Sequence, residues 1–316
     1  MTLAESLFVQ RDLAQWGPGA PDRGIPTPNE AEDYCRDVAC RHYENFPVVT
    51  RFLPRELRQP FYNVYAYCRW ADDLGDEVGD TARSVELLEW WRLLVLRCWE
   101  NDATHPVFIA LNRTRKEYAL PIQPFLDLID AFLQDQKQTR YETYAELRDY
   151  CTRSANPVGR ILLHLFRTVT PQTLGWSDDI CTGLQLANFW QDVARDYDIG
   201  RIYLPQEDCR RFGYAQQDFE QRITNGAFVE LMAFQVQRAK ELLLQGLPLA
   251  DYLPRKLALD VELFARGGLR ILQKIEQAGY RVWETRPVLT KADLLGCLTR
   301  GLTHTLFTRT KTISNR

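Results

Sequence analysis

The stretch YAYCRWADDLGDE, residues 65–77, places four acidic residues directly after an aromatic and largely apolar run. Periodicity predicts a helix over residues 55–79, and spacings of three and four residues put Tyr65, Asp72 and Asp76 on or near one of its faces. The apolar stripe on that face therefore ends in two carboxylates one turn apart. Isolated buried carboxylates are costly unless a cation or a proton accompanies them, so this helix end is a candidate cation site.

The neighbouring charges limit what this acidic stretch can do by itself. Arg69 lies one turn before Asp72 and can neutralise one charge at most. We expect Asp73 and Glu77 to point elsewhere and to be ordinary solvated acids. Taken alone, the whole stretch is also explained as the solvated end of a helix without any function.

A second stretch, QLANFWQDVARDYDIGRIYLP at residues 185–205, repeats the pattern on another predicted helix. It places Gln185, Asn188, Asp192 and Asp196 at spacings of three, four and four, beside apolar neighbours. If the two helices face each other, the four carboxylates and two amides form an oxygen-rich mouth above an apolar cavity. Hard cations take oxygen ligands and complete their shell with phosphate oxygens. The arrangement therefore predicts Mg²⁺, with Mn²⁺ as the alternative, and a diphosphate with an apolar tail.

The rest of the chain is also helical in its pattern. In TPNEAEDYC, Thr27 is the expected N-cap, Pro28 takes the first helical position and Glu30 completes a capping box. From there nearly every window has helical periodicity and strand-like alternation is essentially missing, so we predict an all-α protein. The predicted helices cover about residues 29–44, 55–79, 83–100, 106–117, 121–135, 144–168, 178–198, 227–246, 255–278 and 291–304.

The chain has one segment that lacks this pattern. Residues 1–26 are rich in Gly and Pro after Gln15, and we expect an irregular N-terminal arm there. No linker of low complexity divides the remainder, and it contains no short internal repeat. Residues 27–316 are therefore expected to form a single α-helical domain.

Composition excludes several classes of function. A formal net charge of -3 and a pI of about 5.9 argue against a nucleic-acid partner, because nucleic-acid recognition needs a basic surface. The eight cysteines contain no C-x-x-C pair and no apolar leader peptide precedes them, so we expect reduced thiols in a cytoplasmic protein. The four histidines form no His-x-x-x-His or Glu-x-x-His pair, which argues against zinc and against a di-iron bundle.

Together these motifs resemble the squalene and phytoene synthase family of head-to-head isoprenyl diphosphate synthases. The resemblance covers about residues 30–285 and rests on the paired aspartate motifs, with GRIYLP behind the second. One branch, the bacterial hydroxysqualene synthases of hopanoid biosynthesis, is similar in finer features. These are HYENFPV at 42–48, ADDLGDE, SANPVGR at 154–160 and LQLANFWQDV at 184–193. The resemblance implies an isoprenoid synthase type helical bundle around a central apolar cavity.

The resemblance also implies roles for individual positions. Asp72 and Asp76 match the first metal-binding aspartates, Asp192 and Asp196 match the second pair, and Asn188 is a further metal ligand. The implied catalytic residues are these four aspartates together with Tyr150, which matches a tyrosine near the reacting carbons. The implied substrate-binding residues are His42, Asn45, Tyr65, Arg69, Gln185, Asn188, Arg201 and Tyr203.

For this branch the resemblance implies Mg²⁺-dependent ionisation of presqualene diphosphate, followed by rearrangement and capture of water, which gives hydroxysqualene and diphosphate. That reaction makes the protein a carbon–oxygen lyase of squalene and hopanoid biosynthesis, and it needs no nicotinamide cofactor. The alternative within the family is a prenyltransferase that condenses two farnesyl diphosphates to presqualene diphosphate or squalene, or two geranylgeranyl diphosphates to phytoene. A lipid carrier on the same fold is the non-enzymatic alternative.

The chemistry separates charge, and this sets what the site has to provide. The metal would neutralise the leaving diphosphate, with hydrogen bonds from Arg69, Arg201 and His42. The carbocation left behind needs an apolar cavity with aromatic faces. The aromatic candidates are Phe46, Tyr65, Tyr150, Phe189 and Trp190.

Departures from the family pattern favour one diphosphate over two. Glu44 and Gln191 stand where relatives that bind two prenyl diphosphates have Lys or Arg, so two cationic contacts are missing. ARGG at residues 265–268 replaces a segment that often holds a tyrosine. A less positive pocket suits a single diphosphate better.

The C-terminal segment from Lys291 to Arg316 has five basic residues against Asp293, with leucines between them. It could lie on the anionic surface of the inner membrane, which suits an enzyme whose substrate and product are lipids and which works with other squalene-pathway enzymes. The alternative is a C-terminal helix packed on the bundle with a frayed basic end. No apolar run in the chain reaches the roughly 18 residues that a bilayer span requires.

Overall fold

In a computed structural model of the chain, residues 3–41 and 53–307 are described. Every extended regular element in these ranges is a helix, and the only β-type pairing among them is an isolated bridge between Arg140 and Ile202. The predicted all-α fold is therefore confirmed. None of the described helices is long and apolar enough to cross a membrane.

The backbone contacts divide the chain into two compact units, Met1–Lys137 and Gln138–Arg316. Each unit is described by itself below. That residues 27–316 form a single domain stays a prediction.

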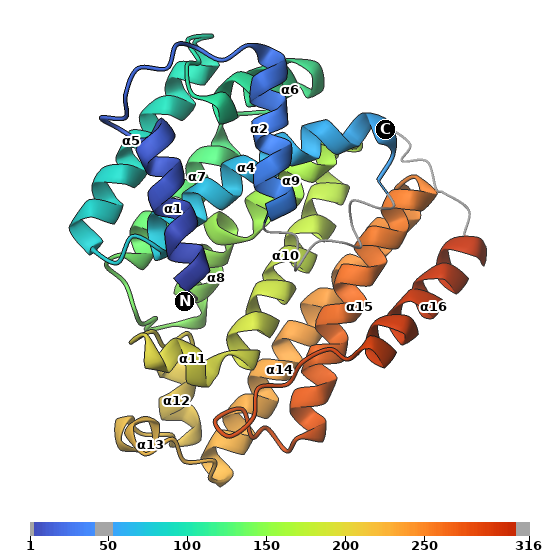
Figure 1. The fold of residues 1–316 in the computed structure, drawn as a ribbon. Helices are drawn as coiled ribbons and strands as arrows, with labels where there is room; N and C mark the ends of the chain where they lie inside the picture. The colour runs from blue at the N-terminus through green and yellow to red at the C-terminus, as the bar shows by residue number, and fades with distance from the viewer. Residues whose placement is uncertain (1–2, 42–52, 308–316) are drawn as a thin grey trace. The chain divides into compact units, whose positions relative to one another are not determined.

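The first unit is organised around one central helix. It consists of α1 (Leu3–Trp16), α2 (Pro28–Arg41), α4 (Arg55–Asp76), α5 (Thr81–Trp99), α6 (Pro106–Tyr118) and α7 (Gln123–Asp135) (Figure 1). The α4 helix contacts α2, α5, α6 and α7, so it has neighbours on several sides. This position explains why α4 buries aromatic residues as large as Tyr67 and Trp70 along most of its length.

The N-terminal arm differs from its prediction. The first part of residues 1–26, expected to be irregular, forms the α1 helix, and only the segment after Trp16 lacks regular structure. The physical reason is that Gly17 and Pro18 stop a helix without disfavouring the residues before it. The capping box that starts α2 is present: the Thr27 amide donates to Glu30 Oε2 at 2.8 Å, and the Glu30 amide donates to Thr27 Oγ1 at 3.4 Å.

A buried histidine fixes the start of α6. His105 Nδ1 accepts a hydrogen bond from the Val107 amide at 3.2 Å, so the neutral ring carries its hydrogen on Nε2. The ring stands edge-on to Trp70 and Trp91, with centroids 4.9 and 5.1 Å away. Burial lowers the pKa of His105 to about 3, so the ring stays neutral at pH 7. His105 is thus a structural N-cap inside an aromatic cluster.

The second unit is built on long packed helices. It contains α8 (Tyr144–Ser154), α9 (Asn156–Leu165), α10 (Pro171–Gln191), α11 (Val193–Asp198), α12 (Gln206–Phe212), α13 (Gln216–Glu220), α14 (Gly226–Gly246), the 3₁₀ helix η2 (Leu247–Tyr252), α15 (Arg255–Gln277) and α16 (Lys291–Phe307). Helix α10 packs along α14 and α15, and α16 packs on α15 (Figure 1). A Cβ on Gly246 would lie 2.6 Å from the Trp176 carbonyl oxygen, so glycine is required where α14 meets α10.

Two predicted helices in this unit have different bounds. The helix expected at 144–168 is divided at Ala155, because Pro157 in the first turn of α9 disfavours a continuous helix before it. The helix expected at 178–198 begins earlier, at Pro171, where Thr170 caps it by accepting from the Thr173 amide at 3.1 Å. The short elements α12, α13 and η2 were not predicted, because five to seven residues carry too little periodicity.

Helix α15 carries a buried carboxyl group. Asp260 is 5 % exposed, and neither of its carboxyl oxygens has a hydrogen-bond partner among the residues that the structure describes. Burial raises the pKa of Asp260 to about 7. The native protein therefore holds this proton at pH values where the unfolded chain has lost it.

Asp260→Asn should remove a pH-dependent loss of stability. The free energy of unfolding of the wild type falls as pH rises from the ordinary aspartate pKa toward about 7, because only the folded state keeps the proton on Asp260. The free energy of unfolding of the variant, relative to that of the wild type, should rise by on the order of 2 kcal/mol between pH 5 and pH 8. Urea unfolding at the two pH values measures this. A constant difference between the two proteins would show that Asp260 ionises freely in the fold.

Candidate active site

The first acidic stretch forms the C-terminal end of α4. Arg69 Nη1 donates to Asp72 Oδ2 at 3.1 Å, and the same guanidinium also forms an ion pair with Asp73. One guanidinium is thus shared by two neighbouring carboxylates. Tyr65 lies one turn earlier and is half-buried, and burial raises its pKa.

The carboxylates on α4 differ in their exposure. Asp72 has a side chain that is 45 % exposed, and Asp76, the last residue of the helix, is exposed as well. Asp73 was expected to be solvated, and that expectation is wrong because its side chain is only 13 % exposed. Burial raises the pKa of Asp73 to about 7, against the opposing effect of Arg69. In this acidic stretch Asp72 and Asp76 are therefore more exposed than Asp73, which is an internal partner of Arg69.

The second acidic stretch spans the junction of α10 and α11. Regular helix stops at Asp192, yet helical hydrogen bonds continue through it. The Asp192 amide donates to the Asn188 carbonyl and the Asp196 amide donates to the Asp192 carbonyl, both at 2.9 Å. The predicted spacing along one side of the helix is therefore kept. Asn188 is exposed and Gln185 half-buried, so both amides are accessible from that side.

A residue that the sequence did not indicate neutralises Asp192. Arg286 forms a bidentate ion pair with this carboxylate: Nη2 lies 2.9 Å from Oδ2, and Nε pairs with Oδ1. Arg195 is more distant, with Nε 3.8 Å from Oδ1. Arg286 lies in an irregular segment far along the chain, where no periodicity or motif links it to the aspartates. Only the folded structure reveals the pair.

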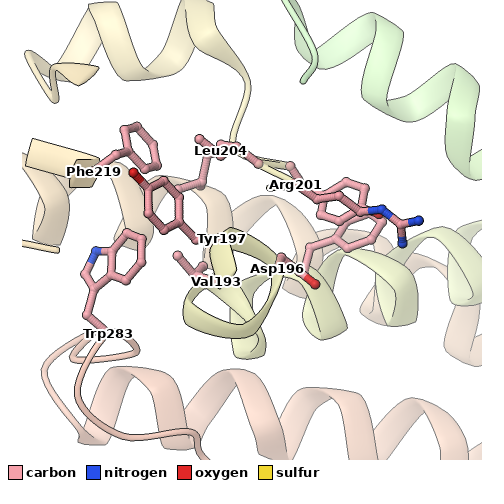
Figure 2. A pocket seen from close by; sticks show the side chains of 10 residues that line it. Val193, Asp196, Tyr197, Arg201, Leu204, Phe219 and Trp283 are labelled. Carbon is pink, nitrogen blue, oxygen red and sulfur yellow. The ribbon is translucent and has the colours of Figure 1, made fainter. Parts of the chain in front are cut away.

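Asp196 lines a small pocket of the second unit (Figure 2). Figure 2 shows Tyr197, Phe219 and Trp283 gathered on one side, with Asp196 and Arg201 on the other. Burial raises the pKa of Asp196 to about 7, and the charge of Asp192 adds to the effect. The complete lining is Phe189, Val193, Asp196, Tyr197, Arg201, Ile202, Tyr203, Leu204, Phe219 and Trp283.

Three aromatic rings from separate segments stack beside this pocket. Phe189 and Tyr203 lie face to face with centroids 3.7 Å apart, and Tyr150 lies 6.3 and 6.1 Å from them. Tyr150 is 3 % exposed, so its hydroxyl-bearing ring belongs to the packed wall. Trp190 was expected to face the cavity, but it is fully buried in the protein interior. Phe189 and Tyr203 both line the pocket.

Two departures from the family pattern have structural explanations. Gln191 is 7 % exposed, and its amide donates to the Pro287 carbonyl instead of facing a ligand. A Cβ on Gly268 would lie 2.8 Å from Leu184 Cδ2 and 3.0 Å from Leu243 Cδ1. Leucine side chains therefore fill the space next to the ARGG segment, and a larger residue at Gly268 would have to displace them.

The predicted site residues thus fall into two groups. The first unit brings together Tyr65, Arg69, Asp72 and Asp76 on α4. The second unit brings together Tyr150, Gln185, Asn188, Asp192, Asp196, Arg201 and Tyr203. His42 and Asn45, as well as Glu44 and Phe46, lie outside the described residues. That the two groups face each other stays a prediction.

Known proteins resemble the chain over most of its length. Residues 39–293 match the model of the squalene/phytoene synthase family. Hydroxysqualene synthase of Rhodopseudomonas palustris is 33 % identical over 74 % of this chain and 80 % of its own. 15-cis-Phytoene synthase of Synechococcus elongatus is 29 % identical over 87 % of this chain and 93 % of its own.

A solved structure also resembles the chain over most of its length. The squalene synthase HpnC from Alicyclobacillus acidocaldarius has a TM-score of 0.77 and 40 % identity, covering 80 % of this chain and 95 % of its own. The predicted isoprenoid synthase type fold is therefore confirmed. On the family match and these likenesses, the chain belongs to the squalene/phytoene synthase family.

Proposed function

We propose that this protein is a hydroxysqualene synthase, which ionises presqualene diphosphate and lets water capture the rearranged cation. Enzymes of its family act on prenyl diphosphates. The observation that carries the proposal is that each unit has a cluster of carboxylates one helical turn apart beside apolar residues, one at the end of α4 and one at the α10–α11 junction. Divalent cations held by these carboxylates would in turn bind the diphosphate.

The donor set fits Mg²⁺, with Mn²⁺ as the alternative. Asp72 and Asp76 would hold it from α4, and Asn188, Asp192 and Asp196 from the α10–α11 junction. All five offer oxygen ligands, which suit a hard cation, and burial together with the charge of Asp192 raises the pKa of Asp196. When bound, the metal would neutralise the charge that develops on the leaving diphosphate.

The chain's own residues would provide orientation and shielding. Arg69 and Arg201 can donate hydrogen bonds to diphosphate oxygens, because guanidinium groups match phosphate geometry. The stacked rings of Tyr150, Phe189 and Tyr203 form a rigid apolar wall against which a hydrocarbon chain can pack. Such a wall keeps water from the cation except where capture is intended.

The absence of a cationic residue at position 191 favours capture of water by one substrate over condensation of two diphosphates. Gln191 takes the place of a cation and is engaged with Pro287, so it offers no contact to a second diphosphate. The similarity to the Rhodopseudomonas hydroxysqualene synthase supports the same assignment. The similarity to phytoene synthases keeps condensation of two prenyl diphosphates as the second candidate. A lipid carrier would not need two clusters of carboxylates that can hold divalent cations.

We also propose that the enzyme works at the cytoplasmic face of the inner membrane, beside other squalene-pathway enzymes. Helix α16 exposes Leu294, Leu295 and Leu302, which are 47, 61 and 38 % exposed, and Lys291 and Arg300 lie on the same helix. Apolar and basic side chains together favour an anionic lipid surface.

Flotation with phosphatidylglycerol vesicles tests this location. The wild-type chain should float, and Leu294→Ser with Leu295→Ser should reduce the bound fraction several-fold, since each loses buried apolar area. Leu244→Ser, which alters an exposed leucine on α14, is the matched control. Equal flotation of all three proteins would contradict a role of α16.

A product assay decides between the enzymatic candidates. Purified protein with Mg²⁺ should convert presqualene diphosphate to hydroxysqualene and should give no product from farnesyl or geranylgeranyl diphosphate. Asp72→Asn and Asp192→Asn should each lower turnover at least about a hundredfold with little loss of folding, because charge on the leaving group goes uncompensated. Asp33→Asn, at an exposed ion pair, is the control.

A C30 or C40 product from farnesyl or geranylgeranyl diphosphate would replace hydroxysqualene synthesis by condensation. Unchanged turnover in both aspartate variants would end the catalytic interpretation of the acidic stretches. Circular dichroism of each variant separates loss of chemistry from loss of fold.

A further inference from the structure

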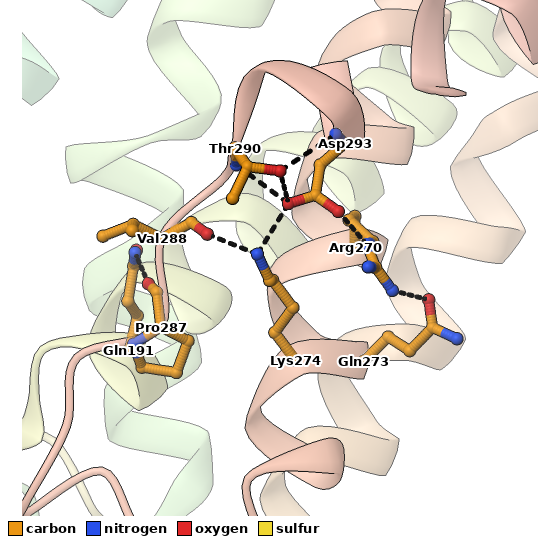
Figure 3. A network of polar contacts seen from close by, with 8 residues as sticks. All are labelled: Gln191, Arg270, Gln273, Lys274, Pro287, Val288, Thr290 and Asp293. Atoms are coloured by element: carbon orange, nitrogen blue, oxygen red, sulfur yellow. Dashed lines mark hydrogen bonds and ion pairs between the residues drawn. The ribbon is translucent and has the colours of Figure 1, made fainter. Parts of the chain in front are cut away.

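The segment of residues 283–290, here called the strap, is anchored on both sides of Arg286. Before Arg286, Trp283 Nε1 donates to the Tyr214 hydroxyl at 3.1 Å. After it, Gln191 donates to the Pro287 carbonyl, and Lys274 Nζ donates to the Val288 carbonyl at 2.7 Å (Figure 3). An irregular segment held by this many side chains has little freedom.

Lys274 is itself fixed by a buried charge network. Asp293 has a side chain that is 6 % exposed, and its oxygens lie 2.6 Å from Lys274 Nζ and 2.7 Å from Arg270 Nε. The Thr290 amide and hydroxyl also donate to Asp293, at 2.8 and 2.7 Å. Figure 3 shows this network joining α15, α16 and the strap. The strap is therefore tied to the helices that flank it.

The consequence is that Arg286 is held against Asp192. Its guanidinium covers both carboxylate oxygens, with the two side chains 33 and 22 % exposed. Bidentate pairs of this kind are specific in geometry and stronger than single contacts. The cation that neutralises Asp192 thus comes from the strap, whereas the adjoining position on α10 is the neutral, buried Gln191.

We propose that the strap makes Arg286 an internal counter-ion of Asp192, which occupies this carboxylate in the metal-free protein and has to leave it when a divalent cation binds. This inference rests on the proposed function, because it concerns the same aspartate. A guanidinium repels a second cation at a shared carboxylate and takes up its lone pairs. Arg286 therefore weakens metal binding to the resting protein and favours binding only when diphosphate brings further negative charge.

Lys274 has a different role in this arrangement. It does not contact Asp192 but holds the strap at Val288, and so it is a positioning residue for Arg286. Lys274→Met should loosen the strap and reproduce part of the effect of removing Arg286. A purely structural ion pair between the strap and α10 would instead change stability and leave metal affinity unaltered.

Titration of the full chain with Mn²⁺, followed by electron paramagnetic resonance, tests the inference. Without diphosphate, Arg286→Ala should bind Mn²⁺ about 3- to 5-fold more tightly than wild type, the upper part of the range expected for a partly exposed ion pair. Arg286→Lys keeps the charge but loses the bidentate contact, so its affinity should lie between those of wild type and Arg286→Ala. Lys274→Met should shift in the same direction as Arg286→Ala by a smaller factor. Arg281→Ala and Lys256→Met, which remove exposed charges from the adjacent turn and from α15, should stay within about twofold of wild type.

The outcomes separate this inference from the proposed function. Equal or weaker Mn²⁺ binding by Arg286→Ala overturns the counter-ion role and leaves the proposed function intact. Failure of every variant and of wild type to bind Mn²⁺, even with inorganic diphosphate added, overturns both. If Arg286→Ala does not fold, as judged by urea unfolding, the result for Lys274→Met decides: unchanged affinity contradicts the inference and tighter binding supports it.

Discussion

Negative charge at the ends of apolar helices has to be compensated, and this constraint shapes both units of the protein. On α4 one guanidinium, Arg69, serves both Asp72 and Asp73. At the α10–α11 junction Arg286 pairs with Asp192, while burial and the charge of Asp192 raise the pKa of Asp196. At both sites neighbouring acids share guanidinium groups. A divalent cation bound there would add positive charge and bind the diphosphate in turn.

The packing around the second acidic stretch fixes the positions of its carboxylates. Helix α10 is held against α14 and α15 by close contacts, and Gly246 is indispensable to one of them. The stack of Phe189 on Tyr203 fixes the wall beside Asp196. Because the carboxylates sit on packed helices, their positions are set before any ligand arrives, and preorganised charge is the main source of electrostatic catalysis.

Local sequence signals predicted the elements that depend on local physics. The capping box at Thr27 and the long periodic stretches give the all-α fold and most helix bounds. The signals failed where a tertiary contact decides the outcome. Asp73 has the same sequence pattern as its acidic neighbours, and only the packing of α4 buries it. Arg286 meets Asp192 through a strap without periodicity, and no spacing rule can foresee such a pair. Short helices such as α13 lie below what periodicity resolves, and the α1 helix was missed because the Gly and Pro residues after it dominated the composition of the arm.

The central claim is that carboxylates from both acidic stretches hold divalent cations together with a diphosphate. Anomalous diffraction from a crystal grown with Mn²⁺ and inorganic diphosphate tests it most directly. The account predicts manganese peaks coordinated by Asp72 or Asp76 on one side of the diphosphate and by Asp192 or Asp196 on the other, with the Arg286 guanidinium withdrawn from Asp192. Manganese bound by only one of the two acidic stretches, or absent from both, would contradict it.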